Sequence, residues 1–408
     1  MDKRVAIVGG GYAGMAAAVE LAGAGIASTV FESGPVPGGR ARRVLSDGLA
    51  LDNGQHILVG AYTELYRLMR AVDVPHSALL RMPLEVRYAR EFGLRRLWLP
   101  GPAGLLGGLL CARGIPLAER LAAIRFVARL RRRGFRLEGD FPVAQLLAAH
   151  GQAGRIGHYL WRPLCVSALN TPPELASAKV FLAVLRDTLG AGPEASDLVL
   201  PRVDLSRLFP EPAAQFVARR GGEVRLKETV RDLAALRSAF RAVIVAVGPH
   251  QLKALVPQAA DYSYQPIYTC YLQYAEATRL PLPMLGLSDG LVQWAFDRGA
   301  LLGEKGRLAC VISAQGDHQQ LQSDELAARC HRELAAVLPG LAAPQWSRVI
   351  AEKRATVTAS VGRPQPPLEP VPGVFLAGDY TDAEYPATLE AAVRSGVRAA
   401  RAALKLAQ

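Results

Sequence analysis

The sequence has few cysteines, and they follow no recognisable pattern. Five cysteines stand far apart in 408 residues: Cys111, Cys165, Cys270, Cys310 and Cys330. Their number is odd, and no two have the spacing of a metal site or a redox pair, which excludes a disulfide scaffold and a cysteine-based metal centre. We therefore expect reduced thiols in the core of a cytoplasmic protein, and no metal.

Long apolar runs are also missing. Half of the residues are apolar and the mean hydropathy is +0.14, yet no run reaches the ~18 residues needed to cross a bilayer. Residues 5–27 imitate a signal peptide because an apolar stretch follows Lys3 and Arg4, but they contain Glu20 and three consecutive glycines. A nucleotide-binding turn accounts for this stretch better than a cleaved leader does.

Acidic residues are in the minority. The chain has 48 Lys and Arg against 36 Asp and Glu, a net charge of +12, which indicates an acidic partner or surface. No nucleic-acid-binding motif accompanies the charge, so we expect no nucleic-acid partner. An anionic membrane suits the high apolar content better, and we expect a cytoplasmic protein with peripheral contact at the inner face of the membrane.

Residues 101–136 are the segment for which we predict membrane contact. A Gly- and Leu-rich stretch precedes a helix that Pro116 opens. That helix combines an apolar stripe with a basic one: Leu117, Leu121, Ile124 and Ala128, and Arg125, Arg129, Arg132 and Arg136. Such a helix can lie in a bilayer interface. A surface helix that covers the core and solvates its arginines has the same pattern, and the sequence leaves both interpretations open.

What the sequence does contain is a complete unit for binding a dinucleotide. An apolar strand leads into Gly9, Gly11 and Gly14 in the order G-x-G-x-x-G, an alanine-rich helix follows, and a second strand ends at Glu32. The glycines allow a tight turn, close approach to a pyrophosphate at the helix N-terminus, and packing of helix on strand. An acid about 20 residues further on accepts ribose hydroxyls and disfavours a 2′-phosphate. A glycine turn without a ligand is the alternative.

Three further segments carry chemistry. Residues 37–43 hold a second glycine pair and Arg40, a forked donor for a planar or phosphorylated ligand, although a plain surface turn has the same composition. Residues 51–58 place His56 in a polar stretch between apolar flanks, where it either faces a reacting centre or packs in the core. A late apolar strand ends at Gly378 and Asp379, and a helix begins near Pro386. That carboxylate can accept sugar hydroxyls, and the helix N-terminus can hold negative charge on a ring.

Taken together, these motifs resemble the flavin amine oxidase and phytoene desaturase superfamily, which implies that the dinucleotide is FAD. The resemblance implies that Glu32 binds the adenosine ribose, Val230 contacts adenine through its backbone, and Thr388 presents an amide to the flavin. The cofactor-binding residues implied are Gly9, Gly11, Tyr12, Ala13, Gly14, Glu32, Gly39, Arg40, Gln55, Val230, Gly378, Asp379, Thr388 and Leu389.

The length of the chain favours two domains, because it exceeds what one hydrophobic core usually supports. Between residues 262 and 315 the strands follow one another with turn-length gaps, which predicts a sheet separate from the first. We expect an α/β protein with a discontinuous Rossmann-like FAD-binding domain, residues 1–72, 201–256 and 365–408. Residues 73–200 and 257–364 are expected to form an α+β substrate domain with a mixed or antiparallel sheet.

Within that superfamily the sequence is most similar to the squalene-associated branch, the hydroxysqualene dehydroxylases. Residues 52–56, 161–172, 293–298 and 386–396 carry this likeness; the sequence departs from it at Ala383 and Glu384, where Thr-Gly is expected. The resemblance implies removal of an allylic hydroxyl from a C30 isoprenoid by reduced flavin. An unidentified donor must then supply the electrons.

The general acid and the substrate slot are hypotheses at this point. His56 is the first candidate acid, with Tyr385 and Glu384 behind it. Five aromatic residues are candidates for the walls of an apolar slot, with core packing as the alternative: Trp161, Tyr268, Tyr271, Trp294 and Phe296. An oxidative desaturase or amine oxidase of the same fold remains an alternative, as does a non-enzymatic isoprenoid-binding protein like the prenyl-protein chaperones.

Overall fold

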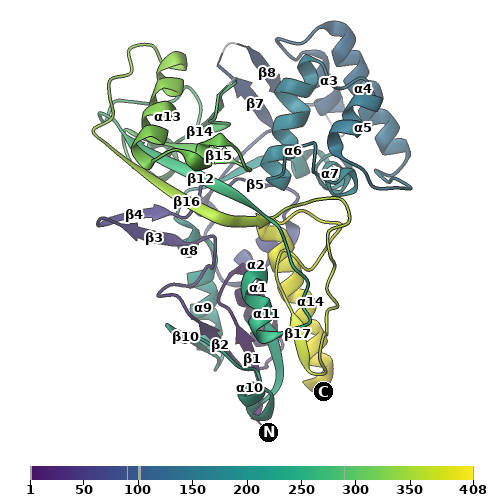
Figure 1. Ribbon diagram of the computed structural model, residues 1–408, viewed down its shortest axis with the longest axis vertical. Helices are drawn as coiled ribbons and strands as arrows, with labels where there is room; N and C mark the ends of the chain where they lie inside the picture. The colour runs from purple at the N-terminus through teal and green to yellow at the C-terminus, as the bar shows by residue number, and fades with distance from the viewer. Residues whose placement is uncertain (1, 90, 100–102, 289, 408) are drawn as a thin grey trace.

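The computed structural model describes residues 2–89, 91–99, 103–288 and 290–407. The strands form two main sheets, one in each half of the molecule, and both chain termini lie at the far end of the half that holds the first sheet (Figure 1).

The first sheet has five strands, all parallel to their neighbours. Their order across the sheet is β10 (Glu223–Leu226), β2 (Ser28–Glu32), β1 (Asp2–Val8), β11 (Phe240–Val245) and β17 (Val374–Leu376). The apolar run from Val5 to Val8 is buried throughout, as in a parallel sheet covered on both faces. The strands come from the three distant segments that the sequence analysis assigned to cofactor binding, although the exact domain bounds remain a prediction.

Helices flank this sheet, and small residues bring two of them close together. The helices of this half are α1 (Tyr12–Gly23), α2 (Thr63–Ala71), α8 (Leu205–Leu208), α9 (Pro210–Arg219), α10 (Ala234–Ala239), α11 (Pro249–Leu255) and α14 (Leu389–Ala407). A Cβ added at Gly396 of α14 would lie 2.1 Å from the carbonyl oxygen of Ala13 in α1. The two helices therefore pack backbone against backbone, directly below the glycine turn.

The second sheet is mixed, as the sequence predicts. Its seven strands are, in spatial order, β16 (Trp346–Val357), β12 (Tyr264–Gln273), β15 (Arg307–Ser313), β14 (Trp294–Asp297), β13 (Met284–Gly286), β7 (Glu85–Tyr88) and β8 (Phe92–Arg95). All neighbours are antiparallel except β13 and β7, which run parallel. The long strands β12 and β16 cross the middle of the molecule (Figure 1). The α/β class with a second, mixed sheet is thus confirmed.

Further helices cover the second sheet on two sides. On one side lie α3 (Ala103–Leu110), α4 (Leu117–Arg132), α5 (Val143–Ala149), α6 (Arg162–Leu169) and α7 (Ala178–Leu185), with the π-helical turns η2 (Gly157–Trp161) and η3 (Arg186–Gly190); α13 (Ser323–Val337) lies on the other, and α12 (Arg298–Leu302) follows β14. Short 3₁₀ turns are η1 (His76–Ala78), η4 (Pro193–Ser196) and η5 (Asp317–Gln320). Two small sheets, β3 (Arg43–Ser46) with β4 (Leu49–Asp52), and β5 (Leu58–Val59), β9 (Leu198–Pro201) and β6 (Leu79–Met82), link the halves.

Helix α4 buries a different face from the one its apolar stripe indicates. The side chains that pack into the core are those of Ala123, Phe126, Val127 and Leu130. Leu117 and Leu121 of the predicted stripe are 58% and 41% exposed, and Ala128 is exposed as well. The helix therefore has two apolar faces, and periodicity alone could not tell which of them meets the core. Residues 101 and 102 of the segment 101–136 lie outside the described residues.

The cysteines mostly follow the expectation of buried thiols. All five are free, and four of them are buried, whereas Cys111, which was expected in the core, is exposed just after α3. Among the helices in the described part of the chain, none is both long and apolar enough to span a bilayer.

Candidate active site

The turn between β1 and α1 has the form of an anion cradle. Gly9 has a φ of +106°, and a Cβ there would lie 2.5 Å from the carbonyl oxygen of Ala246. At Gly11 an added Cβ meets nothing closer than Gly39, at 3.7 Å, so the backbone is open toward the cavity. Gly11 caps α1 without a side-chain hydrogen bond, which leaves the first amides of the helix free for a phosphate. The residues present therefore fit the pyrophosphate of a dinucleotide.

Gly14 has a different role from the other two glycines. A Cβ at this position would lie 1.9 Å from the carbonyl oxygen of Gly9. Gly14 therefore keeps the first turn of α1 pressed against the glycine turn, and it does not line the cavity itself. The hydroxyl of Tyr12 donates to the carbonyl of Leu205 at 2.9 Å, which anchors the same turn from its other side.

Glu32 closes β2 beside the glycine turn. Its two carboxylate oxygens accept hydrogen bonds from the amides of Gly10 at 2.7 Å and Gly34 at 2.6 Å. Each carboxylate oxygen keeps further acceptor capacity, so ribose hydroxyls can bind there as well. Val230, in the segment after β10, lines the same cavity.

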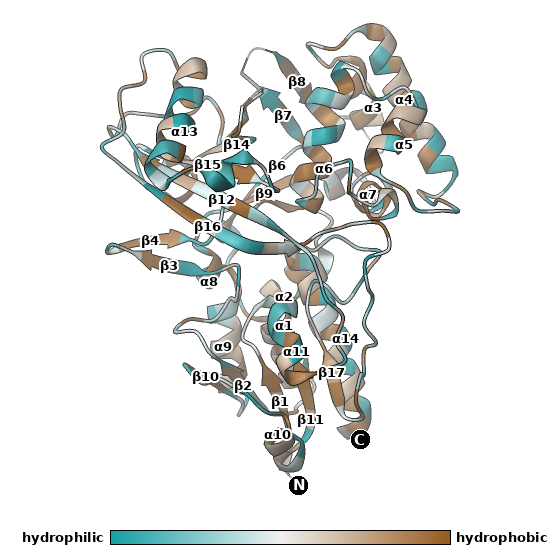
Figure 2. Cartoon of the chain, in the orientation of Figure 1, coloured by the Kyte–Doolittle hydropathy of each residue, from teal (hydrophilic) through white to brown (hydrophobic). Residues whose placement is uncertain are grey.

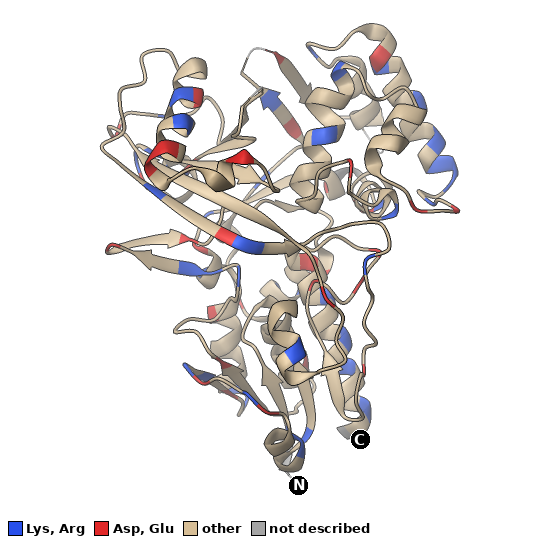
Figure 3. Ribbon diagram, in the orientation of Figure 1, with Lys and Arg blue, Asp and Glu red and all other residues tan. Residues whose placement is uncertain are grey.

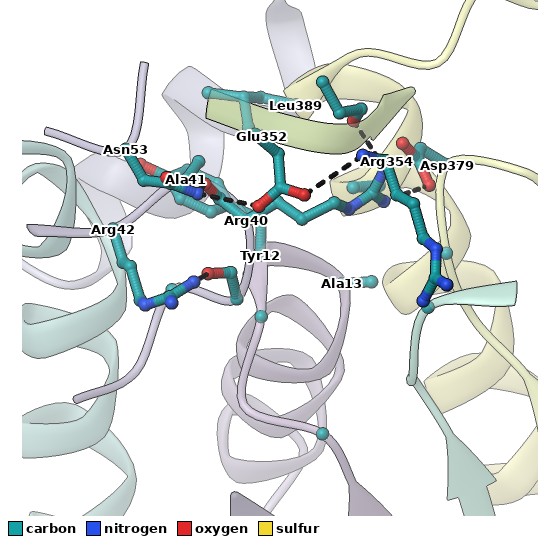
Figure 4. Close-up of a pocket in the computed structure, with 18 of the residues that line it drawn as sticks. Tyr12, Ala13, Arg40, Ala41, Arg42, Asn53, Glu352, Arg354, Asp379 and Leu389 are labelled. Atoms are coloured by element: carbon teal, nitrogen blue, oxygen red, sulfur yellow. Dashed lines mark hydrogen bonds and ion pairs between the residues drawn. The ribbon is translucent and has the colours of Figure 1, made fainter. Parts of the chain in front are cut away.

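Arg40 and Asp379 meet at the middle of the cavity although 339 residues separate them. The Nη2 of Arg40 lies 2.6 Å from Oδ1 of Asp379, and its Nη1 donates to the carbonyl of Ala355 at 2.7 Å. Figure 4 shows Arg40 extending between Asn53 and Asp379 above the N-terminal end of α1. The second oxygen of Asp379 remains to accept a ribityl hydroxyl.

The N-terminus of α14 faces the same cavity. The hydroxyl of Thr388 accepts the amide of Ala391 at 3.2 Å and so caps the helix. The amides near Thr388 and Leu389 thus come from a helix N-terminus, whose dipole favours negative charge on a bound ring.

One cavity of about 950 Å³ connects these features. Of the predicted cofactor-binding residues, all except Gly14 line it: Gly9, Gly11, Tyr12, Ala13, Glu32, Gly39, Arg40, Gln55, Val230, Gly378, Asp379, Thr388 and Leu389. The sequence motifs at the two ends of the chain therefore meet in one continuous site that runs from β2 to α14.

Residues 52–56 are held in place by a buried arginine. Arg298 is 1% exposed, and its guanidinium donates to Asp52 at 3.1 Å, to Gln55 at 3.0 Å and to Glu304 at 2.6 Å. Asn53 donates to the carbonyl of Arg40 at 2.9 Å. The motif around residue 298 thus fixes the loop that forms one wall of the cofactor cavity.

His56 lies in that wall as a neutral base. Its Nδ1 lies 3.1 Å from the carbonyl oxygen of Gly54, so Nδ1 carries the hydrogen and Nε2 is an acceptor. Burial, and secondarily the charge of Arg40, lower the pKa of His56 below its ordinary value. At neutral pH the side chain therefore accepts a hydrogen bond more readily than it donates a proton.

A second cavity of about 170 Å³ forms an apolar slot beside the first. The two share six lining residues: Ile57, Tyr62, Ser167, Ala168, Trp294 and Thr388. The slot's other walls include Leu84, Val86, Leu160, Leu164, Val184 and Met284. An apolar chain bound in the slot would therefore reach the flavin end of the cofactor cavity.

The predicted catalytic and aromatic residues lie in different parts of the fold. Tyr385 lines the slot and His56 the cofactor cavity, whereas Glu384 is exposed and lines neither. Trp294 lines both cavities and Phe296 lines the first.

The other three aromatic candidates pack in the core. The indole of Trp161 donates to Gln152 at 2.9 Å, and the hydroxyl of Tyr271 donates to the carbonyl of Asp52 at 2.9 Å. Tyr268 points from β12 to the side of the sheet that α13 covers, whereas Tyr271 points to the other side. Side chains three residues apart face opposite ways because they alternate along a strand.

Two charged residues beside the slot were not predicted from the sequence. Asp187 lies in the π-helical turn η3 and lines the slot. Arg394 lies in α14, within the motif 386–396, and its guanidinium stands 4.8 Å from the ring centroid of Tyr385. No pattern at residue 187 signals a function, because its partners are about 200 residues away in the chain.

Known proteins resemble this chain in sequence and in fold. Residues 12–404 match the family described as flavin containing amine oxidoreductase. Two proteins named hydroxysqualene dehydroxylase are each 29% identical: that of Sinorhizobium fredii, covering 99% of both chains, and that of Rhodopseudomonas palustris, covering 98% of both. The solved structure of cyclohexylamine oxidase from Brevibacterium oxydans has a TM-score of 0.68 at 15% identity, covering 98% of both chains.

Proposed function

This chain belongs to the flavin-containing amine oxidoreductase family and is an FAD-dependent oxidoreductase, and we propose that it removes the hydroxyl of hydroxysqualene to give squalene. The observation that carries the proposal is the apolar slot that joins the cofactor cavity at Trp294 and Thr388. A slot lined mainly by aliphatic and aromatic side chains suits an isoprenoid chain better than a charged amine. The names of the two similar dehydroxylases support the same substrate.

The chemistry divides between the cofactor and the chain. Reduced FAD, when bound, supplies a hydride to the carbon that loses its hydroxyl. The chain must position that carbon near Thr388, exclude water, and direct a proton to the leaving oxygen so that it departs as water. Tyr385 is our first candidate for the donor of that proton; His56, which is neutral, would have to gain a proton before it could give one. An external donor must restore the reduced flavin.

We expect the enzyme, reduced without oxygen, to convert hydroxysqualene to squalene with one flavin oxidised per squalene formed. The absorbance of the flavin measures how much of it is oxidised, and analysis of the extracted lipids measures how much squalene is formed. The matched control is the same enzyme with its flavin oxidised, which should form no squalene. Desaturation of an isoprenoid polyene or oxidation of an amine, with no squalene formed, would instead assign the chain to the oxidative members of the fold.

We further propose that the chain contacts an anionic membrane through an apolar patch formed by Trp98, Leu99, Leu110, Leu117 and Leu121. These side chains are exposed to 41% or more, and Trp98 to 86%. Helix α3 packs on both the preceding loop and α4: a Cβ at Gly107 would lie 2.8 Å from the Leu97 side chain, and Arg120 of α4 donates to the carbonyl of Leu110 at 3.0 Å.

The charge around the apolar patch favours anionic lipid. Figure 2 shows apolar residues along α3, and Figure 3 shows basic residues on α4 and in the segment that follows it. Exposed arginines such as Arg125 and Arg129 belong to this group. An exposed apolar surface flanked by arginines matches an interface of acyl chains and anionic head groups. Such a position would also let a water-insoluble substrate pass from the bilayer to the slot.

We expect the wild-type enzyme to sediment with anionic vesicles. The double variant Trp98→Ser, Leu117→Ser should bind these vesicles about tenfold more weakly, because two large apolar side chains no longer enter the bilayer. Leu45→Ser is the control: Leu45 is 79% exposed but lies on β3, away from the apolar patch. Zwitterionic vesicles and high salt should both weaken binding. A wild-type enzyme that stays in the supernatant at low salt would contradict the proposal.

A further inference from the structure

One wall of the apolar slot pairs a phenol with a carboxylate. Tyr385 lies just before α14, and Asp187 lies in η3, the π-helical turn that continues α7. The two side chains lie beside the same guanidinium, that of Arg394. Both side chains line the slot, and Tyr385 is only 8% exposed. A π-helical turn often marks a functional position, because it rotates one residue out of the regular helix pattern.

Some other polar side chains of the slot have partners of their own. The indole of Trp294 donates to Ser167 at 2.8 Å, and the hydroxyl of Thr188 donates to the carbonyl of Val184 in its own helix at 2.7 Å. Burial raises the pKa of the Tyr62 phenol, and the side chain of Thr388 lowers it by less. The pair Tyr385 and Asp187 differs from these because it combines a neutral donor with a charged acceptor.

Arg394 fixes this pair electrostatically. Its Nη1 lies 3.6 Å from the Asp187 carboxylate, and its guanidinium stands 4.8 Å from the centroid of the Tyr385 ring. The Nε of Arg394 is held at 2.8 Å by Glu390, which is fully buried and also accepts the amide of Leu65 at 2.9 Å. Arg394 and Arg186, whose Nε lies 3.0 Å from Oδ1 of Asp187, together balance the charge of this carboxylate at the edge of an apolar slot.

Tyr385 stays protonated in this setting. Burial raises the pKa of its phenol above the ordinary value, and Arg394 opposes the shift only in part. A neutral phenol donates one hydrogen bond and accepts others. Its hydrogen is available to whatever oxygen enters the slot.

We propose that Tyr385 and Asp187 form a subsite that binds the hydroxyl of an isoprenoid alcohol. The alcohol oxygen accepts the hydrogen of Tyr385, and the alcohol hydrogen is donated to Asp187, so the substrate makes two hydrogen bonds with the pair. A hydrocarbon of the same length can make neither bond and would leave the polar pair facing an apolar chain. The inference rests on the proposed function and adds to it the residues that distinguish the alcohol from the hydrocarbon product.

The test measures binding to the oxidised holoenzyme, which has no hydride to give. We expect hydroxysqualene to bind about tenfold more tightly than squalene, as one well-placed hydrogen bond allows. Tyr385→Phe keeps the ring beneath Arg394 and should remove this preference, while the affinity for squalene changes less than about twofold. The change in flavin absorbance on titration reports both affinities. Asp187→Asn is the second variant and should also reduce the preference; it serves if Tyr385→Phe does not fold.

Tyr274→Phe is the matched control. It removes the hydroxyl of another buried tyrosine, which contacts His331 at 3.1 Å beneath α13 and lines neither cavity. Its preference for the alcohol should equal that of the wild type.

Two results would overturn the subsite. One is equal affinity of the wild type for the two ligands, and the other is a preference that survives in Tyr385→Phe and Asp187→Asn but disappears in His56→Gln. The proposed function is judged separately by the squalene that the reduced enzyme forms. An enzyme that makes squalene, and whose variants keep the preference for the alcohol, would refute the subsite and leave the function intact.

Discussion

Replacement of Arg298 by methionine is expected to lower the free energy of unfolding by about 3–5 kcal/mol, the usual cost of removing one partner from a buried ion pair. Asp52 and Glu304 would lose their common cation, and Asp52 is only 3% exposed. Gln55 would lose the donor that holds it at 3.0 Å. Because Gln55 lines the cofactor cavity, retention of FAD should fall together with stability.

The loss should be smaller in acid than at neutral pH. Burial raises the pKa of Asp52 even with Arg298 beside it, and without the arginine the native state favours the protonated acid still more. A raised native pKa for an acid stabilises the fold at low pH and loses that effect as pH rises through the native pKa. The loss of unfolding free energy in Arg298→Met should therefore grow from about pH 4 to pH 7.

Urea denaturation at saturating FAD measures these differences. Arg162→Met is the control, because Arg162 contacts Glu174 at 2.6 Å but the two side chains are 45% and 55% exposed. Exposed pairs contribute at most about 1 kcal/mol. Equal losses in the two variants would show that the Arg298 network contributes no more than a surface pair.

Replacement of Gly14 by alanine is expected to weaken FAD binding about 10- to 100-fold. The new Cβ would lie 1.9 Å from the carbonyl oxygen of Gly9, so either the glycine turn or the first turn of α1 must move. Overpacking of this kind typically costs about 1–3 kcal/mol. Here the backbone that moves is the backbone that must contact the pyrophosphate, so most of the cost falls on cofactor affinity.

Gly23→Ala in the same helix is the matched control. A Cβ at Gly23 meets nothing within 4 Å, and alanine favours the helix, so this variant should bind FAD like the wild type and be equally or slightly more stable. Flavin fluorescence titration gives the affinities, and circular dichroism shows whether each variant is folded. A Gly14→Ala enzyme with wild-type affinity for FAD would mean that the turn tolerates the shift.

The cofactor site was largely predictable from the sequence because its parts are local. A glycine turn, the helix after it and Glu32 are specified within the first 32 residues, and each has a direct physical reason in the backbone. The same holds for Gly378 and Asp379, which end a buried strand before a helix. Resemblance to a known superfamily then indicated that these distant parts bind one FAD, and the 950 Å³ cavity that they share is consistent with it.

The orientation of side chains was decided by tertiary packing. Periodicity showed an apolar stripe on α4, but the helix buries Phe126 and Leu130 and leaves Leu117 exposed. The helix has two apolar faces, and only one of them can pack against the core. Alternation along β12 places Tyr268 and Tyr271 on opposite sides of the sheet. Tyr271 is held by its hydrogen bond to the carbonyl of Asp52 and Tyr268 packs in the cluster that includes residues of α13, so neither lines the slot.

By itself, the sequence determined the dinucleotide turn and the strands that carry it, since these depend on backbone conformation within short segments, and its resemblance to a known superfamily implied that the dinucleotide is FAD. The tertiary structure alone brought Arg298 to Asp52 across 246 residues, and Asp187 to Tyr385 and Arg394. Charged groups so far apart in the chain leave no spacing pattern, because what pairs them is the burial that makes an unpaired charge costly.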